Sequence, residues 1–250
     1  MRSQSLTKGG LYRFLPAIEA TPGDSVTLYI EPARFPGYLD SLSLEPKYRM
    51  YTDEIREAVS CKAVIQGIKK RETGAVVFWG GAGNKHIILP PYIITESKVS
   101  TDKLDVSFLR QLLGRRYVTG VVLVTWGSYA IGVFDADSLV ASKKGTGYIH
   151  KEHRKGGRSE KRFARRTEEQ KKDFLRKVSN RIDENLGDFI LDDIFFGGNR
   201  LIIKPLLQEC KYLQSRAHKI SPRILNVRYA DKEALLGSLA EITQSLVFTF

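Results

Sequence analysis

The chain has 250 residues, 42% of them hydrophobic and 10% aromatic, which allows one large core or two compact ones and excludes a disordered protein. Its two cysteines, Cys61 and Cys210, support neither a disulfide framework nor a metal site, and no apolar run suits a bilayer span or a signal peptide. We therefore expect a soluble cytoplasmic protein without cofactors or membrane contact, whose net charge of +12 indicates an anionic partner.

Residues 1–115 are predicted to form a small mixed α/β domain. Residues 24–32 are β-rich and end in a proline, which predicts a strand. Residues 52–74 carry apolar side chains loosely at helical spacing and predict one helix that Gly74 ends. Residues 75–90 hold two apolar runs around Gly-Gly-Ala-Gly-Asn, which predicts a β-hairpin, because the glycine spacing does not match a phosphate-binding loop.

Residues 116–250 are predicted to form a second domain with the order β-β-β-α-β-α-β-α and a mixed sheet. Residues 117–144 predict two long strands followed by a third, shorter one. A long helix is expected over residues 159–186, and its buried face is expected to consist of Phe163, Phe174, Val178, Ile182 and Leu186. The remaining elements are expected as a strand at 190–198, a helix beginning near Pro205, a strand at 222–230 and a closing helix at 231–246.

Two-thirds of the net charge lies in residues 151–181, where 13 Lys and Arg face 5 Asp and Glu. Such a concentration indicates a nucleic-acid contact more than an ordinary solvated helix, which would intersperse more acids. Within it, residues 153–166 read HRKGGRSEKRFARR and set two glycines among the cations. The cations expected to neutralise RNA phosphates are Arg154, Lys155, Lys161, Arg162, Arg165 and Arg166.

This segment resembles the signature loop and helix of the archaeal and eukaryotic class I peptide-chain release factors. In that family a Gly-Gly-Gln tip follows basic residues and precedes a serine, an Arg-Phe pair and a helix. Gly156, Gly157, Ser159 and Arg162 with Phe163 match this order, and the strands and helices on both sides are also similar. The resemblance implies an α/β (α+β) fold, with a release-factor N-terminal-like domain over 1–115. It further implies an RNase H-like middle-type domain over 116–250.

Three departures from the family narrow this expectation. The codon-reading Asn-Ile-Lys-Ser motif has no counterpart, a GTPase-docking domain after the middle-type domain is not expected, and Arg158 replaces the glutamine. The first two features resemble the Vms-like release factor group, which includes short bacterial members associated with ribosome rescue. The resemblance therefore implies that the partners are the large ribosomal subunit, its ribosomal RNA and peptidyl-tRNA.

In this family the loop cleaves the ester between a nascent peptide and tRNA, which implies that Gly156, Gly157 and Arg158 are the catalytic residues. Glycines let bare backbone enter a narrow site, and a backbone N–H at the tip can stabilise an oxyanion. The Arg158 guanidinium cannot act as a base at neutral pH. It can stabilise the oxyanion, or it can bind a tRNA phosphate without hydrolysis. His150 and His153 lie close to the tip, where phosphate contact suits them better than catalysis.

Two functions stay open. The first is a ribosome-rescue release factor that hydrolyses peptidyl-tRNA on stalled large subunits independently of a stop codon. The second is a non-catalytic ribosome- or tRNA-binding quality-control factor whose loop lost hydrolysis with Arg158. A third interpretation is an RNA-binding protein of unrelated target, or a nuclease. The acidic pairs Asp135 with Asp137 and Asp192 with Asp193 are better explained as turn and strand-end residues than as metal ligands.

Overall fold

The computed structural model describes residues 1–35, 37–42, 46–81, 83–149 and 158–250, the last range without the side chains of residues 158–161. The chain folds into two compact units, one of Met1–Arg115 with Ala240–Phe250 and one of Arg116–Leu239. Each unit contains one β-sheet covered by helices, so the predicted mixed α/β class is confirmed. Among the described helices, none is both long and apolar enough to span a bilayer.

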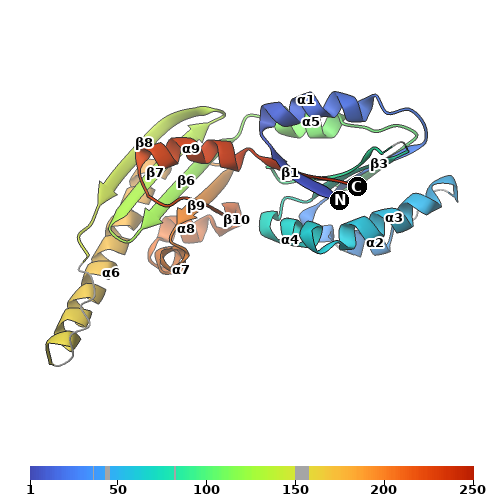
Figure 1. Cartoon of the computed structure of the whole chain (residues 1–250). Helices are drawn as coiled ribbons and strands as arrows, with labels where there is room; N and C mark the ends of the chain where they lie inside the picture. The colour runs from blue at the N-terminus through green and yellow to red at the C-terminus, as the bar shows by residue number, and fades with distance from the viewer. Residues whose placement is uncertain (36, 43–45, 82, 150–157) are drawn as a thin grey trace. The chain divides into compact units, whose positions relative to one another are not determined.

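The first unit is built on a six-stranded sheet with the order β1-β11-β4-β3-β2-β5, and all of its pairs are antiparallel. Its strands are β1 (Arg2–Leu6), β2 (Ser25–Ile30), β3 (Ala75–Gly80), β4 (Lys85–Leu89), β5 (Lys98–Thr101) and β11 (Ser245–Thr249). Its helices are α1 (Lys8–Glu19), α2 (Gly37–Asp40), α3 (Arg49–Ser60), α4 (Lys62–Arg71) and α5 (Ser107–Gly114). Helices α1 and α5 cover one face, and α2, α3 and α4 cover the other (Figure 1).

The central strands of this sheet are buried on both faces, which explains their continuous apolar sequences. Every residue of β2 and β3 is buried. Side chains of β2, β3 and β4 alternate between the two helical layers, and one layer joins Val26, Val77 and Ile87 to Ile55 of α3 in a single core cluster. The predicted strand at 24–32 and the predicted hairpin at 75–90 are confirmed.

Two expectations for this unit need correction. The single helix predicted over 52–74 is two helices, because Cys61 has an extended ψ of 130°. Its N–H donates to the Ala58 carbonyl, while its own carbonyl accepts from the N–H of Val64, so it ends α3 and begins α4. The closing helix predicted to reach residue 246 ends at Ile242, and β11 follows it. The last eleven residues therefore belong to the first unit rather than to a domain over 116–250, because β11 pairs with β1 and β4.

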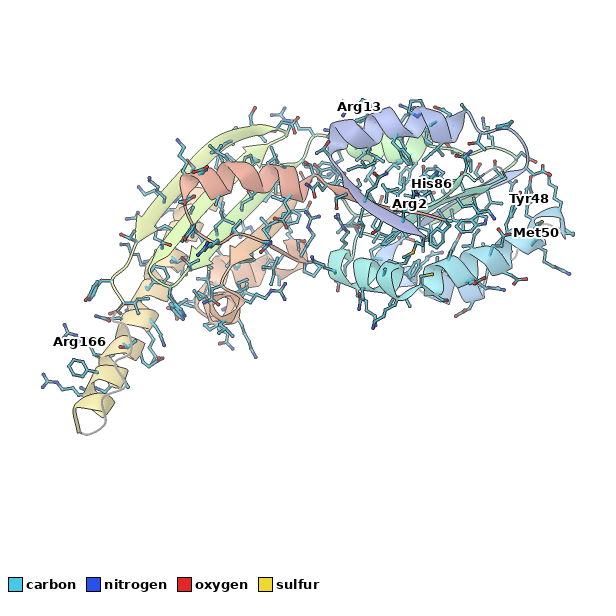
Figure 2. The ribbon with its side chains drawn as sticks, in the orientation of Figure 1. Arg2, Arg13, Tyr48, Met50, His86 and Arg166 are labelled. Atoms are coloured by element: carbon cyan, nitrogen blue, oxygen red, sulfur yellow. The ribbon has the colours of Figure 1, made fainter. Side chains whose placement is uncertain are left out.

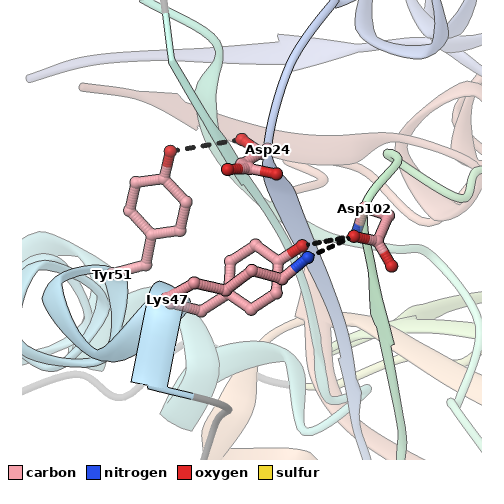
Figure 3. A network of polar contacts seen from close by, with 5 residues as sticks. Asp24, Lys47, Tyr51 and Asp102 are labelled. Atoms are coloured by element: carbon pink, nitrogen blue, oxygen red, sulfur yellow. Dashed lines mark hydrogen bonds and ion pairs between the residues drawn. The ribbon is translucent and has the colours of Figure 1, made fainter.

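A small polar network fixes the segment that precedes α3 (Figure 3). The Lys47 ammonium and the Tyr48 hydroxyl both donate to Asp102 Oδ1, at 2.6 and 2.7 Å. These two donors lower the pKa of the Asp102 carboxyl, with Lys47 as the larger cause. The Tyr51 hydroxyl donates to the Asp24 carbonyl at 3.2 Å. Lys47 and Tyr48 are thus tied to the residue that follows β5, and the first turn of α3 is tied to the residue that precedes β2.

The second unit is built on a five-stranded mixed sheet with the order β10-β9-β6-β7-β8. Its strands are β6 (Val118–Thr125), β7 (Ser128–Asp135), β8 (Ser138–Thr146), β9 (Asp193–Gly198) and β10 (Ile220–Leu225). Its helices are α6 (Arg158–Leu186), α7 (Arg200–Glu209), α8 (Lys211–Ser215) and α9 (Lys232–Ile242). Strand β9 is parallel to both β6 and β10, and the β6-β7-β8 meander is antiparallel, as the predicted mixed sheet requires.

Helices cover both faces of this sheet (Figure 1). Val122, Tyr129 and Ile131 face α6, α7 and α8 in one apolar cluster. On the other face α9 approaches β7 closely at Gly132, where an added Cβ would stand 2.8 Å from the Leu235 side chain. The mutual burial of these faces is the main stabilising contribution to the unit.

The element order predicted for residues 117–242 is confirmed, with two local corrections. Strand β8 has nine residues and is not shorter than β6 or β7. Helix α7 begins at Arg200 rather than near Pro205, because the Asn199 side chain caps it by accepting from the Leu201 N–H at 2.9 Å. Pro205 removes the helical donor for the Leu201 carbonyl. Leu201 is 80% exposed, so solvent can reach this end of the helix.

Candidate functional site

Helix α6 is held in its unit by the apolar face of its C-terminal half. Phe174, Val178, Ile182 and Leu186 recur every four residues and are at most 3% exposed. The Tyr212 hydroxyl of α8 donates to the Leu186 carbonyl at 2.8 Å and fixes the end of the helix. Since each fully buried apolar side chain stabilises the fold by about 1.5–3 kcal/mol, this half forms a firm base for the residues nearer the N-terminus.

The N-terminal part of α6 extends away from the sheet of its unit (Figure 1), and Arg166 lies on this extension in Figure 2. Residues 162–166, which we call the basic arm, are all exposed, and Thr167 is the first buried residue after them. Phe163 is 52% exposed, so the prediction that it belongs to the buried face of the helix is wrong. It precedes Phe174 by eleven residues, about 16 Å along the helix axis, and the apolar cluster of the unit does not reach that far.

The positive charge of the basic arm is largely uncompensated by the described part of the protein. Arg165 Nε lies 3.4 Å from Glu169 Oε1, but both side chains are exposed, and such pairs contribute only about 0.3–0.5 kcal/mol. Arg162 and Arg166 form no ion pair with another residue that the structure describes. An exposed helix with these side chains can bind a polyanion without first breaking strong internal contacts.

The strand that leads toward the paired glycines is fixed to the same helix. The Thr146 carbonyl, at the end of β8, accepts a hydrogen bond from Lys177 Nζ at 2.8 Å. The N–H of Gly147 donates to the Gly127 carbonyl at 2.9 Å. Gly147 also lies so close to Phe174 that an added Cβ would stand 2.5 Å from Cδ2 of the ring. A side chain at this position would displace a buried aromatic ring, so the close approach requires glycine.

Trp126 joins the β6–β7 turn to α6 beside this contact. Its ring centroid lies 6.2 Å from that of Phe174, and Lys171 Nζ lies 5.5 Å from the Trp126 ring centroid. Lys171 also pairs with Glu168 at 2.7 Å. A cation over an indole face contributes about 0.5–1 kcal/mol at exposed sites. Strand β8, the β6–β7 turn and α6 therefore meet in one packed base from which the basic arm extends.

The site residues predicted from the sequence fall into three groups. Those outside the described residues are Arg154, Lys155, Gly156 and Gly157, together with His150 and His153. Arg158 begins α6 and Lys161 follows in its first turn, and the structure describes their backbone only. Arg162, Arg165 and Arg166 lie exposed on the basic arm. The catalytic and RNA-binding roles assigned to all of these residues stay predictions.

Asp135 and Asp192 make contacts within their own unit. Arg116 donates to both carboxylate oxygens of Asp135, which lowers the pKa of that carboxyl. Asp192 Oδ2 accepts from the Val118 N–H at 2.8 Å, at the start of β6. Within the described ranges no three His, Cys, Asp or Glu side chains are grouped as metal ligands. Asp135 and Asp192 act as expected from their positions at a turn and a strand end.

Sequence reasoning does not single out Gly147, Trp126 or Lys177, although one signal was present. The chain reads Gly-Thr-Gly at residues 145–147, and two glycines two positions apart lie on the same side of an extended segment. On that side Gly145 meets the Tyr129 ring and Gly147 meets the Phe174 ring. Paired glycines at the end of a strand therefore mark a close approach to aromatic rings.

The second unit matches a known protein family over most of its length. The family model described as Actinobacteria/chloroflexi VLRF1 release factor matches residues 117–247, slightly more than half of the chain. The matched region runs from β6 to β11 and includes the basic arm.

Two relatives are peptide chain release factors. Peptide chain release factor subunit 1 of Aeropyrum pernix is 25% identical over 232 residues, which cover 84% of this chain and 61% of that protein. Eukaryotic peptide chain release factor subunit 1 of Oxytricha trifallax is 29% identical over 133 residues, or 51% of this chain and 29% of that protein. The chain thus matches less than two thirds of the length of either relative.

Solved structures show a looser likeness. A crystal structure of the archaeal translation termination factor aRF1 is 18% identical, with a TM-score of 0.39, and the alignment covers 95% of this chain and 73% of that one. The Pelota structure of Archaeoglobus fulgidus is 10% identical, with a TM-score of 0.34, covering 96% of this chain and 61% of that one.

Proposed function

The chain belongs to the Actinobacteria/chloroflexi VLRF1 release factor family, and from this premise we propose that it is a ribosome-rescue release factor. In this role it hydrolyses the ester that joins the nascent peptide to tRNA on stalled large ribosomal subunits, without reading a stop codon. The observation that carries the proposal is the basic arm. It places exposed arginines on a firmly based helix that leads directly to the paired glycines.

The geometry of α6 suits delivery of a loop into a narrow RNA site. Arg158 begins the helix nine residues before Thr167, the first buried side chain of α6 after the basic arm. At 1.5 Å per residue the helix axis runs about 14 Å from Arg158 to Thr167, and the side chains described on it, those of residues 162–166, are exposed. The exposed arginines along this length can pair with RNA phosphates on the way. The second unit has 24 Lys and Arg against 15 Asp and Glu in residues 116–239, so the surrounding field also attracts RNA.

The chemistry rests on the tip. Water attacks the ester carbonyl, and a tetrahedral oxyanion forms. A main-chain N–H near Gly157 donates to this oxyanion. Cleavage of the bond between the carbonyl carbon and the ribose oxygen then releases the peptide carboxylate, while one proton of the attacking water passes to the ribose oxygen and the other passes to solvent. Arg158 keeps the backbone donor of the residue it replaces, and its guanidinium adds positive charge beside the oxyanion, although it cannot accept a proton.

Features of the first unit support the proposal that release is independent of a stop codon. The segment between β2 and α3 has no Asn-Ile-Lys-Ser sequence, and Lys47 and Tyr48 in its described part both donate to Asp102. We propose that this unit places the protein on the ribosome without decoding. Its partners in this account are the large subunit, ribosomal RNA and peptidyl-tRNA.

The alternative is a non-catalytic factor that binds the ribosome or tRNA in quality control. One specific observation favours it, namely that arginine occupies position 158. A guanidinium that pairs with a tRNA phosphate would hold the substrate without positioning water. In that account the basic arm performs the same binding role, and only hydrolysis is absent.

Peptide release from purified peptidyl-tRNA on large ribosomal subunits separates these functions. We expect the unchanged protein to release peptide, and Gly157→Ala to lower the release rate by about 100-fold, the scale of a disturbed oxyanion site. Binding of Gly157→Ala to subunits should stay unchanged because no charge is altered. Gly237→Ala serves as a matched control, since no atom lies within 4 Å of the added methyl group.

If the unchanged protein releases no peptide and Arg158→Gln gains release, the hydrolytic function is rejected and the non-catalytic binding function is supported. Cosedimentation with ribosomal subunits tests whether the protein binds the ribosome at all. A preference for unrelated RNA over large subunits would remove both translation functions and leave only an RNA-binding protein of another kind.

A further inference from the structure

Phe163 is a large apolar side chain that the described part of the protein leaves uncovered. It is 52% exposed and makes no ring contact with another described residue. Thr167 and Phe174 lie four and eleven residues further along α6, on the same side of the helix. The apolar face of the helix thus continues past the core and ends in a phenyl ring that adds little to the stability of its unit.

The neighbours of Phe163 distinguish it from an ordinary exposed apolar residue. Single exposed apolar side chains are common on protein surfaces and need no function. Phe163, however, is flanked by Arg162, Arg165 and Arg166, all of them exposed. Arg166 lies three residues further along and therefore beside the ring on the helix surface. Tyr148, which follows β8 on the other side of the predicted loop, is also 73% exposed. An exposed aromatic side chain therefore occurs on each side of that segment in the sequence.

This combination fits single-stranded RNA. A base stacks on an aromatic ring while arginines pair with the phosphates on either side. Duplex RNA has no open base face to offer, because its bases are already stacked on each other. An acidic protein surface could pair with the arginines, but it would cover the ring only where it also exposes an aromatic or apolar side chain, whereas every unpaired nucleotide carries a base beside its phosphate. The chemistry of the arm therefore favours an unpaired nucleotide.

We propose that Phe163 is a base-stacking residue, which holds one unpaired nucleotide of RNA against the basic arm. The inference rests on the proposed function and adds to it the kind of nucleotide that the arm takes. Stacking of this kind positions the arm and takes no part in the hydrolytic chemistry. The unpaired base has two sources, the single-stranded 3′ end of tRNA and an unpaired loop of ribosomal RNA.

The test is a binding cycle with two RNA probes and four forms of the full chain. One probe is a fluorescein-labelled single strand of about ten adenylates, within the length that single-strand binding sites span. The other has the same sugar-phosphate chain without bases, and binding is followed by anisotropy. The proteins are the unchanged chain, Phe163→Leu, Phe163→Tyr and Tyr229→Leu. Tyr229 is the matched control, because it is 60% exposed and lies beside Arg228 in the same unit, away from α6 in sequence.

We expect Phe163→Leu to weaken binding of the base-containing strand by about 5- to 100-fold, the range that single stacked bases contribute. Its affinity for the abasic strand should change little, because the phosphates and arginines are the same. Phe163→Tyr should bind as the unchanged chain does, and so should Tyr229→Leu. Thermal unfolding should be the same in all four, since both altered side chains are exposed.

Equal affinities of Phe163→Leu and the unchanged chain for the adenylate strand would overturn the proposal. An equal loss on both probes would also overturn it, since the ring would then act by shaping the arm. In either case peptide release by the unchanged chain would still support the proposed function. Repeating the cycle with a tRNA acceptor hairpin and a ribosomal RNA hairpin identifies which RNA supplies the stacked base. Only that RNA should bind Phe163→Leu more weakly than it binds the unchanged chain.

Discussion

Replacing Gly147 with alanine tests whether the base of the arm is as tightly built as the contacts indicate. The new Cβ would stand 2.5 Å from Cδ2 and 3.2 Å from Cε2 of Phe174. Ordinary carbon contacts are about 3.5–4.0 Å, so one of the two groups must move by about 1 Å. The Phe174 ring is 3% exposed and packs against the rings of Trp126 and Tyr129, which leaves it little room to move.

Overpacking of this kind typically costs about 1–3 kcal/mol. With a urea dependence of about 1–3 kcal/mol per molar, the unfolding midpoint of the second unit should fall by about 1 M. Gly237→Ala should act in the opposite direction. It lies in α9 with no atom within 4 Å of the added methyl group, and alanine favours a helix over glycine by about 0.5–1 kcal/mol.

The chain has two tryptophans, Trp79 in the first unit and Trp126 in the second, so each unit has its own fluorescent probe. Urea unfolding followed by Trp126 in a Trp79→Phe background reports the second unit alone. The double variant Gly147→Ala with Phe174→Leu should recover part of the loss, because leucine makes room for the methyl group. A midpoint for Gly147→Ala at or above that of the unchanged chain would refute the close contact and the rigid base inferred from it.

Two further predictions concern charge. The affinity of the double variant Arg162→Ala with Arg166→Ala for large subunits should fall less steeply with salt. The slope of log affinity against log salt should be less negative by about 1 to 2, since each phosphate contact contributes about 0.7–0.9. An unchanged slope would show that these side chains face away from RNA. Burial lowers the pKa of His86 (Figure 2) below its ordinary 6.5, so the folded state keeps the imidazole neutral while the unfolded chain binds a proton below that pH. The free energy of unfolding of the first unit should therefore fall between pH 7.5 and 5.5, and urea titrations of His86→Gln, followed by Trp79, should show a smaller fall. The same fall in His86→Gln would assign the pH dependence to other groups.

Local signals in the sequence were enough for most of the second unit. The β6-β7-β8 meander followed from apolar runs separated by Gly127 and by residues 135–138. The C-terminal half of α6 followed from the four-residue apolar spacing between Phe174 and Leu186. The closing helix was predicted to begin at residue 231, and Asp231 Oδ1 accepts from the Ala234 N–H at 2.8 Å at the start of α9. Each of these features depends on residues within a few positions of one another, where pattern and propensity act directly.

Features that depend on distant partners were missed or misplaced. The sequence predicts that the closing helix continues to residue 246, but Ser245–Thr249 forms a strand because β1 and β4 pair with its two edges. Periodicity placed Phe163 on the buried face of α6, since a helical pattern shows which residues share a face but not where the neighbouring core ends. The need for glycine at position 147 comes from a ring 27 residues away.

The sequence by itself determined that a charged, glycine-bearing segment joins a strand to a long amphipathic helix, because composition and spacing are local properties. Only the tertiary structure decided how much of that helix is packed and how much is presented. That division depends on where the sheet and the helices α7 and α8 stop, and burial is decided by contacts between segments far apart in the chain. The exposed phenyl ring and arginines of the basic arm are the result of that division.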